Sequence, residues 1–474
     1  MLFNTFEFLI FFISVVTLFF SVPQKRRWII LLAASYFFYG YWKPSYLVLI
    51  FLSTVLDFFL SNRIHSCKEK KKKKRLLYLS LTSNLGLLFL FKYFDFLAGS
   101  INEGLEYFKS DYKISLLNLL LPVGISFYTF QTMSYTIDVY NGKLKPEKHF
   151  GIFALFVSFF PQLVAGPIER ASNLLPQLNT RVSLNYERLT SGLQLILWGL
   201  FKKVVVADRV AIVSNEIFNN HQEYHGFTLI IGVIFFAFQI YCDFSGYSDI
   251  AIGTARTLGY DLMKNFNSPY FASSLTDFWR RWHISLSTWF KDYLYIPLGG
   301  NRVIKWRWYF NLWITFFISG IWHGANWTFV LWGAIHGTGL IIENILSFKK
   351  EKKFLFVRKI WIFFIVCLAW VFFRSNSIND ALEFVSSLFS FSEYKLNQLS
   401  FYIVSTSKNT VFSTDFILSY TVIILLLLVE QNLIIKKKWK LLPSFFKLII
   451  CSVATVSIFL IGVFEFKEFI YFQF

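Results

Sequence analysis

Two histidines in apolar surroundings are the first candidates for chemistry, and His323 is one of them. It lies within an apolar run near residues 308–330 and is flanked by Gly320 and Gly324. A charged imidazole at membrane depth costs a few kcal/mol, so we expect a neutral, hydrogen-bonded ring. Neutral imidazole is a competent general base, and small neighbours let a substrate approach closely. Taken alone, however, these residues favour a packing role between helices over a catalytic one.

His283 is the second candidate. It lies between Arg281 and the hydroxyl groups of Ser285 and Ser287, and it is the one residue of the segment 277–302 with a reference pKa near neutrality. Most of that segment, rich in Trp, Tyr and cations, is typical of an amphipathic helix at the membrane interface. The interfacial interpretation does not account for the histidine, so a functional and a structural role both stay open.

A third polar segment, Tyr241–Asp249, closes an apolar run near residues 226–243. Its two carboxylates, Asp243 and Asp249, are costly at bilayer depth, so we expect them to face a cavity or a partner. They could form the wall of a polar tunnel. Alternatively, the Ser and Asp residues could cap the start of the next helix.

The remaining histidines and the cysteines carry no recognisable chemistry. For His336, in the next apolar run, a structural role is favoured, and four others lie in polar loops where we expect them to be solvated: His65, His149, His221 and His225. No HExxH motif or Cys/His cluster predicts a metal site, and GxSxG and GxxxxGK[ST] are absent. The four cysteines lack CxxC spacing and are expected to fill apolar positions.

The elements that must position these residues are membrane helices. Of 474 residues, 16% are charged and 55% are hydrophobic, and the mean hydropathy is +0.50. A soluble globular protein has about 25% charged residues. The composition therefore excludes the roughly three soluble domains that this length would allow. We expect one integral membrane domain over residues 1–474.

The apolar runs predict an all-α polytopic membrane protein, a bundle of about 11–14 transmembrane and re-entrant helices. Several runs are shorter than the roughly 20 residues that cross a bilayer, so we expect some paired, tilted or re-entrant helices. Residues 244–307 are too polar to cross the membrane as a regular transmembrane helix and too aromatic for an exterior loop. This composition predicts re-entrant backbone. The runs lie near residues 6–22, 28–42, 45–60, 76–95, 115–133, 150–167, 190–201, 226–243, 308–330, 331–346, 360–374, 413–434 and 445–465.

The net charge of +19 comes mostly from basic clusters between apolar runs, as the positive-inside bias predicts. No basic face exists apart from these loops, which disfavours nucleic acid as a partner. We expect the clusters on the cytoplasmic side, among them Lys68–Arg75, Lys202–Lys203 and Lys349–Lys353. The segment 375–412 is then the largest external loop.

Several long strings resemble the membrane-bound O-acyltransferase family, and specifically its bacterial branch of alginate and peptidoglycan O-acetyltransferases. The strings are FWRRWHISLSTWFKDYLYIPLGGNR at 278–302, WHGANW at 322–327, LWG at 331–333, PQLVAGPIER at 161–170 and QIYCDFSGYSD at 239–249. The resemblance covers most of the chain and is densest between residues 120 and 340. Cys242 and Lys291 depart from the expected pattern, where an aromatic residue and an arginine would stand.

The resemblance implies a helical bundle around a tunnel, with His323 as the catalytic residue and His283 as the polar residue that joins it. The chemistry would be acyl transfer to a hydroxyl: His323 would take the proton from the nucleophile, and His283 would bind or polarise the acyl group. Relatives of this branch move acetyl groups from a cytoplasmic donor towards the exterior.

The same resemblance sets the expected surroundings. We expect no permanently bound cofactor, an acyl donor such as acetyl-CoA or another cytoplasmic acyl thioester, and a multi-pass protein in contact with lipid in the bacterial cytoplasmic (inner) membrane. The acceptor would be an envelope or exported polysaccharide, reached through an extracytoplasmic acetyltransferase partner. Two alternatives stay open: a lipid or protein acyltransferase with a long acyl chain, and a transporter or flippase without covalent transfer.

Overall fold

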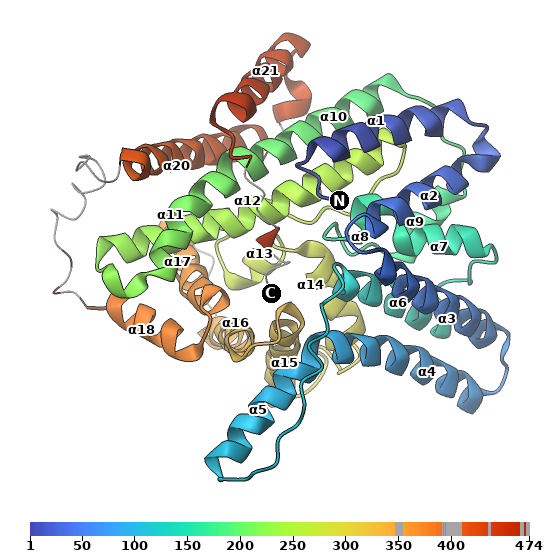
Figure 1. Cartoon of the computed structure of the whole chain (residues 1–474), viewed down its shortest axis with the longest axis horizontal. Coiled ribbons are helices and arrows are strands. Elements are labelled where there is room, and N and C mark those ends of the chain that lie inside the picture. Colours follow the sequence, from blue (N-terminus) through green and yellow to red (C-terminus); the bar gives the residue numbers. More distant parts are fainter. Residues whose placement is uncertain are drawn as a thin grey trace. The chain divides into compact units, whose positions relative to one another are not determined.

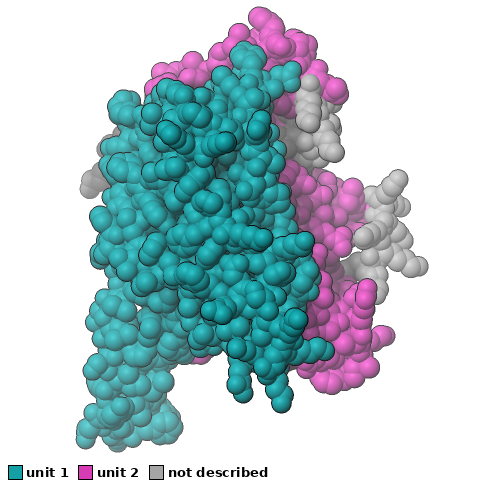
Figure 2. Space-filling view, turned by 90° about the vertical axis from the view of Figure 1, so that its right-hand side faces the viewer, with its two compact units in different colours: residues 1–196, 250–263 teal, residues 197–249, 264–474 magenta. Residues whose placement is uncertain are grey.

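A computed structural model describes residues 1–346, 354–390, 392, 394, 410–434, 438–464 and 469–470. All regular elements in these ranges are helices, as expected for an all-α protein (Figure 1). The chain forms two compact units, which Figure 2 distinguishes by colour. Unit 1 contains residues 1–196 and 250–263, and unit 2 contains residues 197–249 and 264–474.

Within the described ranges, seven helical stretches are long and apolar enough to cross a membrane. A further apolar helix, α1 (Phe6–Ser21), is shorter. The prediction of an all-α, multi-pass membrane protein is therefore confirmed. The seven stretches are Pro44–Ser66, Lys70–Tyr107, Phe227–Thr257, Trp327–Leu346, Leu355–Arg374, Asp415–Asn432 and Ser444–Ile461.

Unit 1 is built from the first helices of the chain. A buried carboxylate in it is paired: Asp57 accepts hydrogen bonds from Ser80 and Asn84 on a neighbouring helix, which satisfies the charge in an apolar interior. After α1, its helices are α2 (Arg27–Gly40), α3 (Leu47–Ser66), α4 (Lys70–Leu88), α5 (Phe94–Tyr107), α6 (Ile125–Tyr140), α7 (Phe150–Ser158), α8 (Phe160–Leu163), α9 (Ala171–Leu178) and most of α10 (Tyr186–Leu200).

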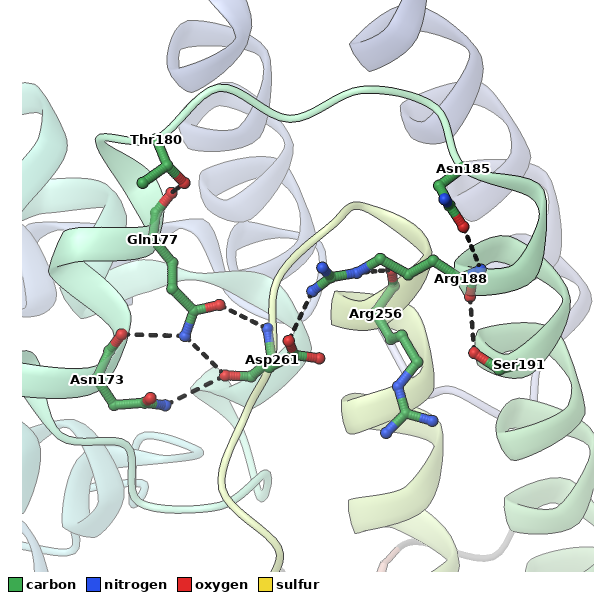
Figure 3. A network of polar contacts seen from close by, with 8 residues as sticks. All are labelled: Asn173, Gln177, Thr180, Asn185, Arg188, Ser191, Arg256 and Asp261. Atoms are coloured by element: carbon green, nitrogen blue, oxygen red, sulfur yellow. Dashed lines mark hydrogen bonds and ion pairs between the residues drawn. The ribbon is translucent and has the colours of Figure 1, made fainter. Parts of the chain in front are cut away.

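A polar network in unit 1 joins α9 to the segment that follows α12 (Figure 3). Gln177 and the backbone of Asp261 exchange two hydrogen bonds, of 2.7 and 2.9 Å, and the carboxylate of Asp261 pairs with Arg188 at 2.9 Å. Nearby, the buried Glu169 accepts a hydrogen bond from the backbone N–H of Met263 at 2.8 Å. The 161–170 string thus contributes a carboxylate that holds residues 261–263 in place.

Unit 2 holds most of the remaining helices and all the candidate site residues. The hairpin of α15 and α16 packs closely along its length (Figure 1). The helices are α11 (Asp208–Asn219), most of α12 (Phe227–Thr257), α13 (Leu275–Trp279), α14 (Ile284–Phe290), α15 (Lys305–His323), α16 (Trp327–Leu346), α17 (Leu355–Arg374), α18 (Ile378–Leu388), α20 (Thr410–Val429) and α21 (Ser444–Ile461), together with the π-helix η4 (Phe201–Ala207).

The boundary predicted between the runs 308–330 and 331–346 is wrong. Helix α15 ends at His323 and α16 begins at Trp327. Gly324 is extended, with φ −159° and ψ 153°, and the side chain of Asn326 accepts a hydrogen bond from the N–H of Thr328 at 3.0 Å. An asparagine that caps the first turn starts a helix, so His323 lies at a helix end rather than inside a run.

Three other stretches also differ from expectation. The run near 115–133 is helical only from Ile125, and its leucines before residue 121 are mostly exposed. The segment 241–249 lies inside α12, so its residues do not cap a new helix. Within the expected external loop 375–412, α18 is formed, whereas residues 391, 393 and 395–409 lie outside the described ranges.

The expected re-entrant region, 244–307, contains α13 and α14 after the end of α12. These helices have five and seven residues, which is too short to cross a bilayer. They precede α15 and carry the His283 segment.

Candidate active site

His323 lies among aromatic rings at the C-terminal end of α15. The residue is 3% exposed. Its ring centroid is 4.9 Å from that of Trp332, 5.1 Å from that of Trp322 and 5.5 Å from that of Phe373, and all three rings meet it edge to face. These rings fix the plane of the imidazole and keep bulk water away from it.

Two glycines bring the backbones of α15 and α16 into contact near His323. A Cβ atom on Gly320 would lie 2.3 Å from the carbonyl oxygen of Phe329, and one on Gly333 would lie 2.4 Å from that of Phe316. Neither position has room for a methyl group. The WHG and LWG strings therefore form one tight hairpin, which positions His323 against Trp332.

His283 is the N-cap residue of α14 and adopts the left-handed conformation, with φ 41° and ψ 55°. This conformation is uncommon for residues other than glycine and costs on the order of 1–3 kcal/mol. Two backbone hydrogen bonds hold the turn: Ile284 N–H donates to the carbonyl of Asn265 at 2.8 Å, and Asn267 N–H donates to that of Arg281 at 2.9 Å. Strain maintained in this way is found at functional sites.

The side chain of Asn265 connects His283 to its surroundings. Its Oδ1 atom accepts hydrogen bonds from the backbone N–H of Ser285 at 3.3 Å and from the Ser285 hydroxyl at 2.9 Å. The same oxygen lies 3.1 Å from Nδ1 of His283. On its other side, Nδ2 of Asn265 donates to the hydroxyl of Ser248, on α12, at 3.1 Å.

These contacts determine the tautomer of His283. A backbone N–H can only donate, so the Asn265 atom that faces Ser285 is the amide oxygen. Because this oxygen can only accept, Nδ1 of His283 carries the hydrogen. Burial lowers the pKa of His283 to about 3, so the ring is neutral near pH 7. Nε2 therefore carries a lone pair, and any group that binds there must donate a hydrogen.

The structure brings the two predicted histidines together. The ring centroids of His283 and His323 are 6.5 Å apart, and Trp322 contacts both. His283 itself is fully buried, with Phe244 edge-on at 4.6 Å. Both imidazoles lie in an apolar setting, and His283 is neutral there, an arrangement suited to proton transfer.

The other five histidines differ in their exposure to solvent. His336 packs against Trp279 and against Trp332, which also contacts His323. No described group is hydrogen-bonded to either ring nitrogen of His336. A structural role for it stays a prediction. His65, His149 and His225 are exposed, as expected. The expectation for His221 was wrong: its side chain is only 13% exposed because α18 covers it, with Glu383 3.7 Å away.

The two carboxylates of α12 face charged partners. Asp243 pairs with Lys203 at 2.6 Å, and Asp249 pairs with Lys202 at 2.6 Å. Lys203 also pairs with Asp208 at 3.0 Å. Burial opposes the ammonium charge of Lys203, but these carboxylates outweigh it and hold the pKa of the lysine above its usual range.

The expectation that Lys202–Lys203 mark a cytoplasmic loop is therefore wrong. Both lysines are buried in η4, where the wider turn of a π-helix directs two consecutive side chains towards α12. Asp243 additionally accepts a hydrogen bond from the N–H of Ile470 at 2.7 Å. Such charges lie within the protein interior because each has a counter-ion, so they do not report the side of the membrane.

Comparison with known proteins places this geometry in a family. The profile of MBOAT, the membrane-bound O-acyltransferase family, matches residues 148–379. A probable alginate O-acetylase of Azotobacter vinelandii is 39% identical over 385 residues, covering 81% of this chain and 77% of the relative. The chain belongs to the membrane-bound O-acyltransferase family. It is therefore an enzyme, and the family resemblance expected from the sequence is confirmed.

Other relatives of this O-acyltransferase extend the comparison. A peptidoglycan O-acetyltransferase of Helicobacter pylori is 39% identical over 405 residues, covering 79% of this chain and 76% of the relative. A teichoic acid D-alanyltransferase of Streptococcus thermophilus is 30% identical over 265 residues, covering 50% of this chain and 59% of the relative. The relatives' names describe the transfer of acetyl or D-alanyl groups to alginate, peptidoglycan or teichoic acid.

Sequence reasoning missed Asn265 in this O-acyltransferase. Asn265 belongs to an irregular segment between α12 and η6 (Pro269–Phe271), where hydrophobic periodicity has no meaning. It stands eighteen positions before His283, and no spacing rule relates an amide to a histidine at that distance. A possible signal was Ser285: a hydroxyl two positions after a buried histidine needs a partner.

Replacing Asn265 tests the tautomer. Asn265→Ala removes the oxygen that accepts hydrogen bonds from His283 and Ser285, and we expect acyl transfer to fall about 10–100-fold, because loss of a hydrogen-bond partner in a buried site costs about 1–3 kcal/mol. Asn265→Asp supplies a carboxylate that raises the pKa of His283. Its activity should fall as the pH is lowered from 8 to 6, whereas the wild-type rate shows no His283 titration in that range. An Asp variant that gains activity at low pH would mean that the imidazolium is the active form.

Proposed function

We propose that this O-acyltransferase moves acetyl groups from a cytoplasmic thioester towards the outside of the cell for O-acetylation of an envelope or exported polysaccharide. The observation that carries the proposal is the pair of buried histidines at the ends of α15 and the 265–283 segment, 6.5 Å apart between ring centroids. The relatives named for alginate and peptidoglycan acetylation support the acetyl group and the polysaccharide.

The reaction we propose is a direct acyl transfer. A hydroxyl oxygen attacks the thioester carbonyl carbon, a C–O bond forms, and the C–S bond breaks. His323 accepts the proton of the attacking hydroxyl and delivers it to the leaving thiolate, so the ring is neutral again at the end of the cycle. The surrounding Trp and Phe side chains exclude water that would otherwise hydrolyse the thioester.

The role we propose for His283 is narrower than the resemblance suggests. In the Nδ1–H tautomer, Nε2 accepts a hydrogen bond and cannot donate one to a carbonyl oxygen. His283 thus binds a donor group of the substrates, such as an N–H of the thioester carrier, rather than polarising the acyl group. Arg281 and Ser285 also have other partners, since Arg281 pairs with Asp277 at 2.9 Å and Ser285 donates to Asn265.

The remaining expectations belong to this proposal. The acyl donor is acetyl-CoA or another cytoplasmic thioester, bound transiently, and no group is bound permanently. The enzyme works in the bacterial cytoplasmic (inner) membrane and passes the acetyl group to an extracytoplasmic acetyltransferase partner. Its basic clusters outside the buried η4 support this orientation, with Lys68–Arg75 on the cytoplasmic side.

The experiment is a deletion of the gene in the producing cells, followed by two measurements on the same cultures. We expect alkali-labile acetate on the envelope and exported polysaccharides to be lost and to return with the wild-type gene, whereas the acyl composition of lipids and membrane proteins stays unchanged. Unchanged polysaccharide acetate, together with a loss of lipid or protein acyl groups, would contradict the proposal and favour the long-chain alternative.

A further inference from the structure

The three bulkiest side chains that are fully buried in the described part of the chain are tryptophans, and all three lie close to the histidine pair. They are Trp282, Trp332 and Trp370. The rings of Trp332 and Trp370 stack, with centroids 5.8 Å apart and planes 18° from parallel. The ring of Trp370 in turn lies 5.0 Å from that of Trp282. We call these three rings the indole stack.

The indole stack joins the two segments that carry the histidines. Trp332, on α16, meets the ring of His323 at 4.9 Å. Trp282 directly precedes His283 in the sequence. Trp370, on α17, contacts both of the other indoles. The stack therefore extends within unit 2 from one histidine-bearing segment to the other and forms one wall of the candidate active site.

Phe373 reinforces this wall beside His323. Its ring centroid lies 5.3 Å from that of Trp332 and 5.2 Å from that of Trp370. It also lies 5.5 Å from that of His323. Protein interiors are packed as densely as organic crystals, so rings in mutual contact leave no channel for an alkyl chain between them. A chain longer than acetyl could extend towards the stack only by displacing these rings.

The polar atoms of the indole stack also bear on what lies against it. None of its three indole N–H groups has a hydrogen-bond partner among the described residues. A buried indole N–H is usually paired with an acceptor, and an unpaired one is destabilising. The carbonyl oxygen of an acyl thioester can accept such a hydrogen bond, whereas an alkyl chain cannot. The unpaired donors therefore favour a short acyl group, whose oxygen stays close to the wall, over a long chain.

We propose that the indole stack limits the acyl group to acetyl, with Trp332 and Trp370 as the residues that determine this specificity. The inference rests on the proposed function, which supplies the acyl thioester, and it gives the reason why a long chain is excluded. In a hydrophobic pocket, one additional methylene group changes recognition by about 10–200-fold. Extra methylene groups forced into a packed interior displace side chains. A smaller side chain in place of an indole should therefore admit a longer acyl group.

Binding of unreactive donor analogues tests the inference without an acceptor or a transfer step. The probes are acetyl, butyryl and hexanoyl derivatives of phosphopantetheine, the arm that coenzyme A shares with acyl carrier proteins. A methylene group replaces the thioester sulfur, so the carbonyl is kept and the acyl group cannot leave. Full-length protein in lipid nanodiscs is titrated with each probe by calorimetry. We expect the wild type to bind the acetyl probe about tenfold or more tightly than the hexanoyl probe.

Two variants and one control complete the experiment, each checked by thermal unfolding. Trp332→Leu and Trp370→Leu should each raise the affinity for the hexanoyl probe by about tenfold or more, because each opens space beside His323. Trp361→Leu removes an exposed tryptophan from the same helix as Trp370 and should keep the wild-type preference.

Three results would overturn the inference. They are a wild type that binds the acetyl probe no more tightly than the hexanoyl probe, a wild type that binds no probe, and folded Trp332→Leu and Trp370→Leu proteins that both keep the wild-type preference. Failure of the proposed function would appear separately, as polysaccharide acetate that survives deletion of the gene.

Discussion

Polysaccharide-bound acetate should fall about 100-fold or more when His323 is replaced by Ala or Gln, since a positioned general base contributes about 10²–10⁴-fold. The ring has no conservative substitute here: it ends α15, packs between Trp322 and Trp332, and faces His283. Gln keeps a polar group of similar reach but cannot take a proton near pH 7. The loss should therefore be similar in both variants.

The control for this prediction is His65→Ala, which removes an exposed histidine from α3. All variants are compared at matched protein levels in isolated membranes, with ester-bound acetate measured after mild alkaline release. We expect wild-type acetate in the control. A His323→Gln enzyme that keeps more than a tenth of the wild-type acetate, while fully folded, would show that His323 is not the base.

The largest effect on stability should follow from Lys203→Met. Lys203 pairs with both Asp243 and Asp208, so its loss removes the cation that these two buried carboxylates share. Breaking a buried ion pair from one side costs about 3–5 kcal/mol. We expect the variant to unfold at a clearly lower temperature in detergent and to be depleted from the membrane, whereas Asp243→Asn should be milder because Lys203 keeps Asp208.

The exposed Lys143 provides the matched control, because it lies 4.0 Å from Asp138 with a 64% exposed side chain. Lys143→Met should leave the thermal midpoint unchanged, as expected for a surface pair. The triple variant Lys203→Met with Asp243→Asn and Asp208→Asn removes the uncompensated charge and should recover much of the stability. A Lys203→Met protein as stable as the Lys143→Met control would contradict the assignment of a buried charge cluster.

The helical class and the histidine pair could be predicted from the sequence, for different physical reasons. Helical membrane segments follow from apolar length alone, because no other backbone arrangement of that length is satisfied in lipid. His323 and His283 were identified from their polar or small neighbours and from the family strings. Their mutual approach was not predictable, since it depends on where α15 ends and on the left-handed turn at His283.

The sequence-based predictions were wrong where the same local sequence is compatible with two different structures. Adjacent lysines such as Lys202 and Lys203 are typical of a loop that marks the cytoplasm, yet here a π-helix buries both against carboxylates. Gly324 and Asn326 interrupt α15 and α16 within an apolar run whose hydropathy shows no break. Whether a lysine is buried depends on its tertiary ion pairs, and where a helix ends depends on single capping residues. Hydropathy averaged over a window of sequence detects neither.

The central claim is that an acetyl group, and not the whole donor, crosses the membrane in a step that depends on His323. Everted membrane vesicles from producing cells, whose outer face is the cytoplasmic one, are supplied with acetyl-CoA labelled with ¹⁴C in the acetyl group and ³H in the coenzyme. We predict ¹⁴C in the lumen as alkali-labile ester, ³H outside as an equal amount of free thiol, and neither product with His323→Ala. Entry of both labels together, or thiol release that is unaffected by the substitution, would contradict the account and indicate transport.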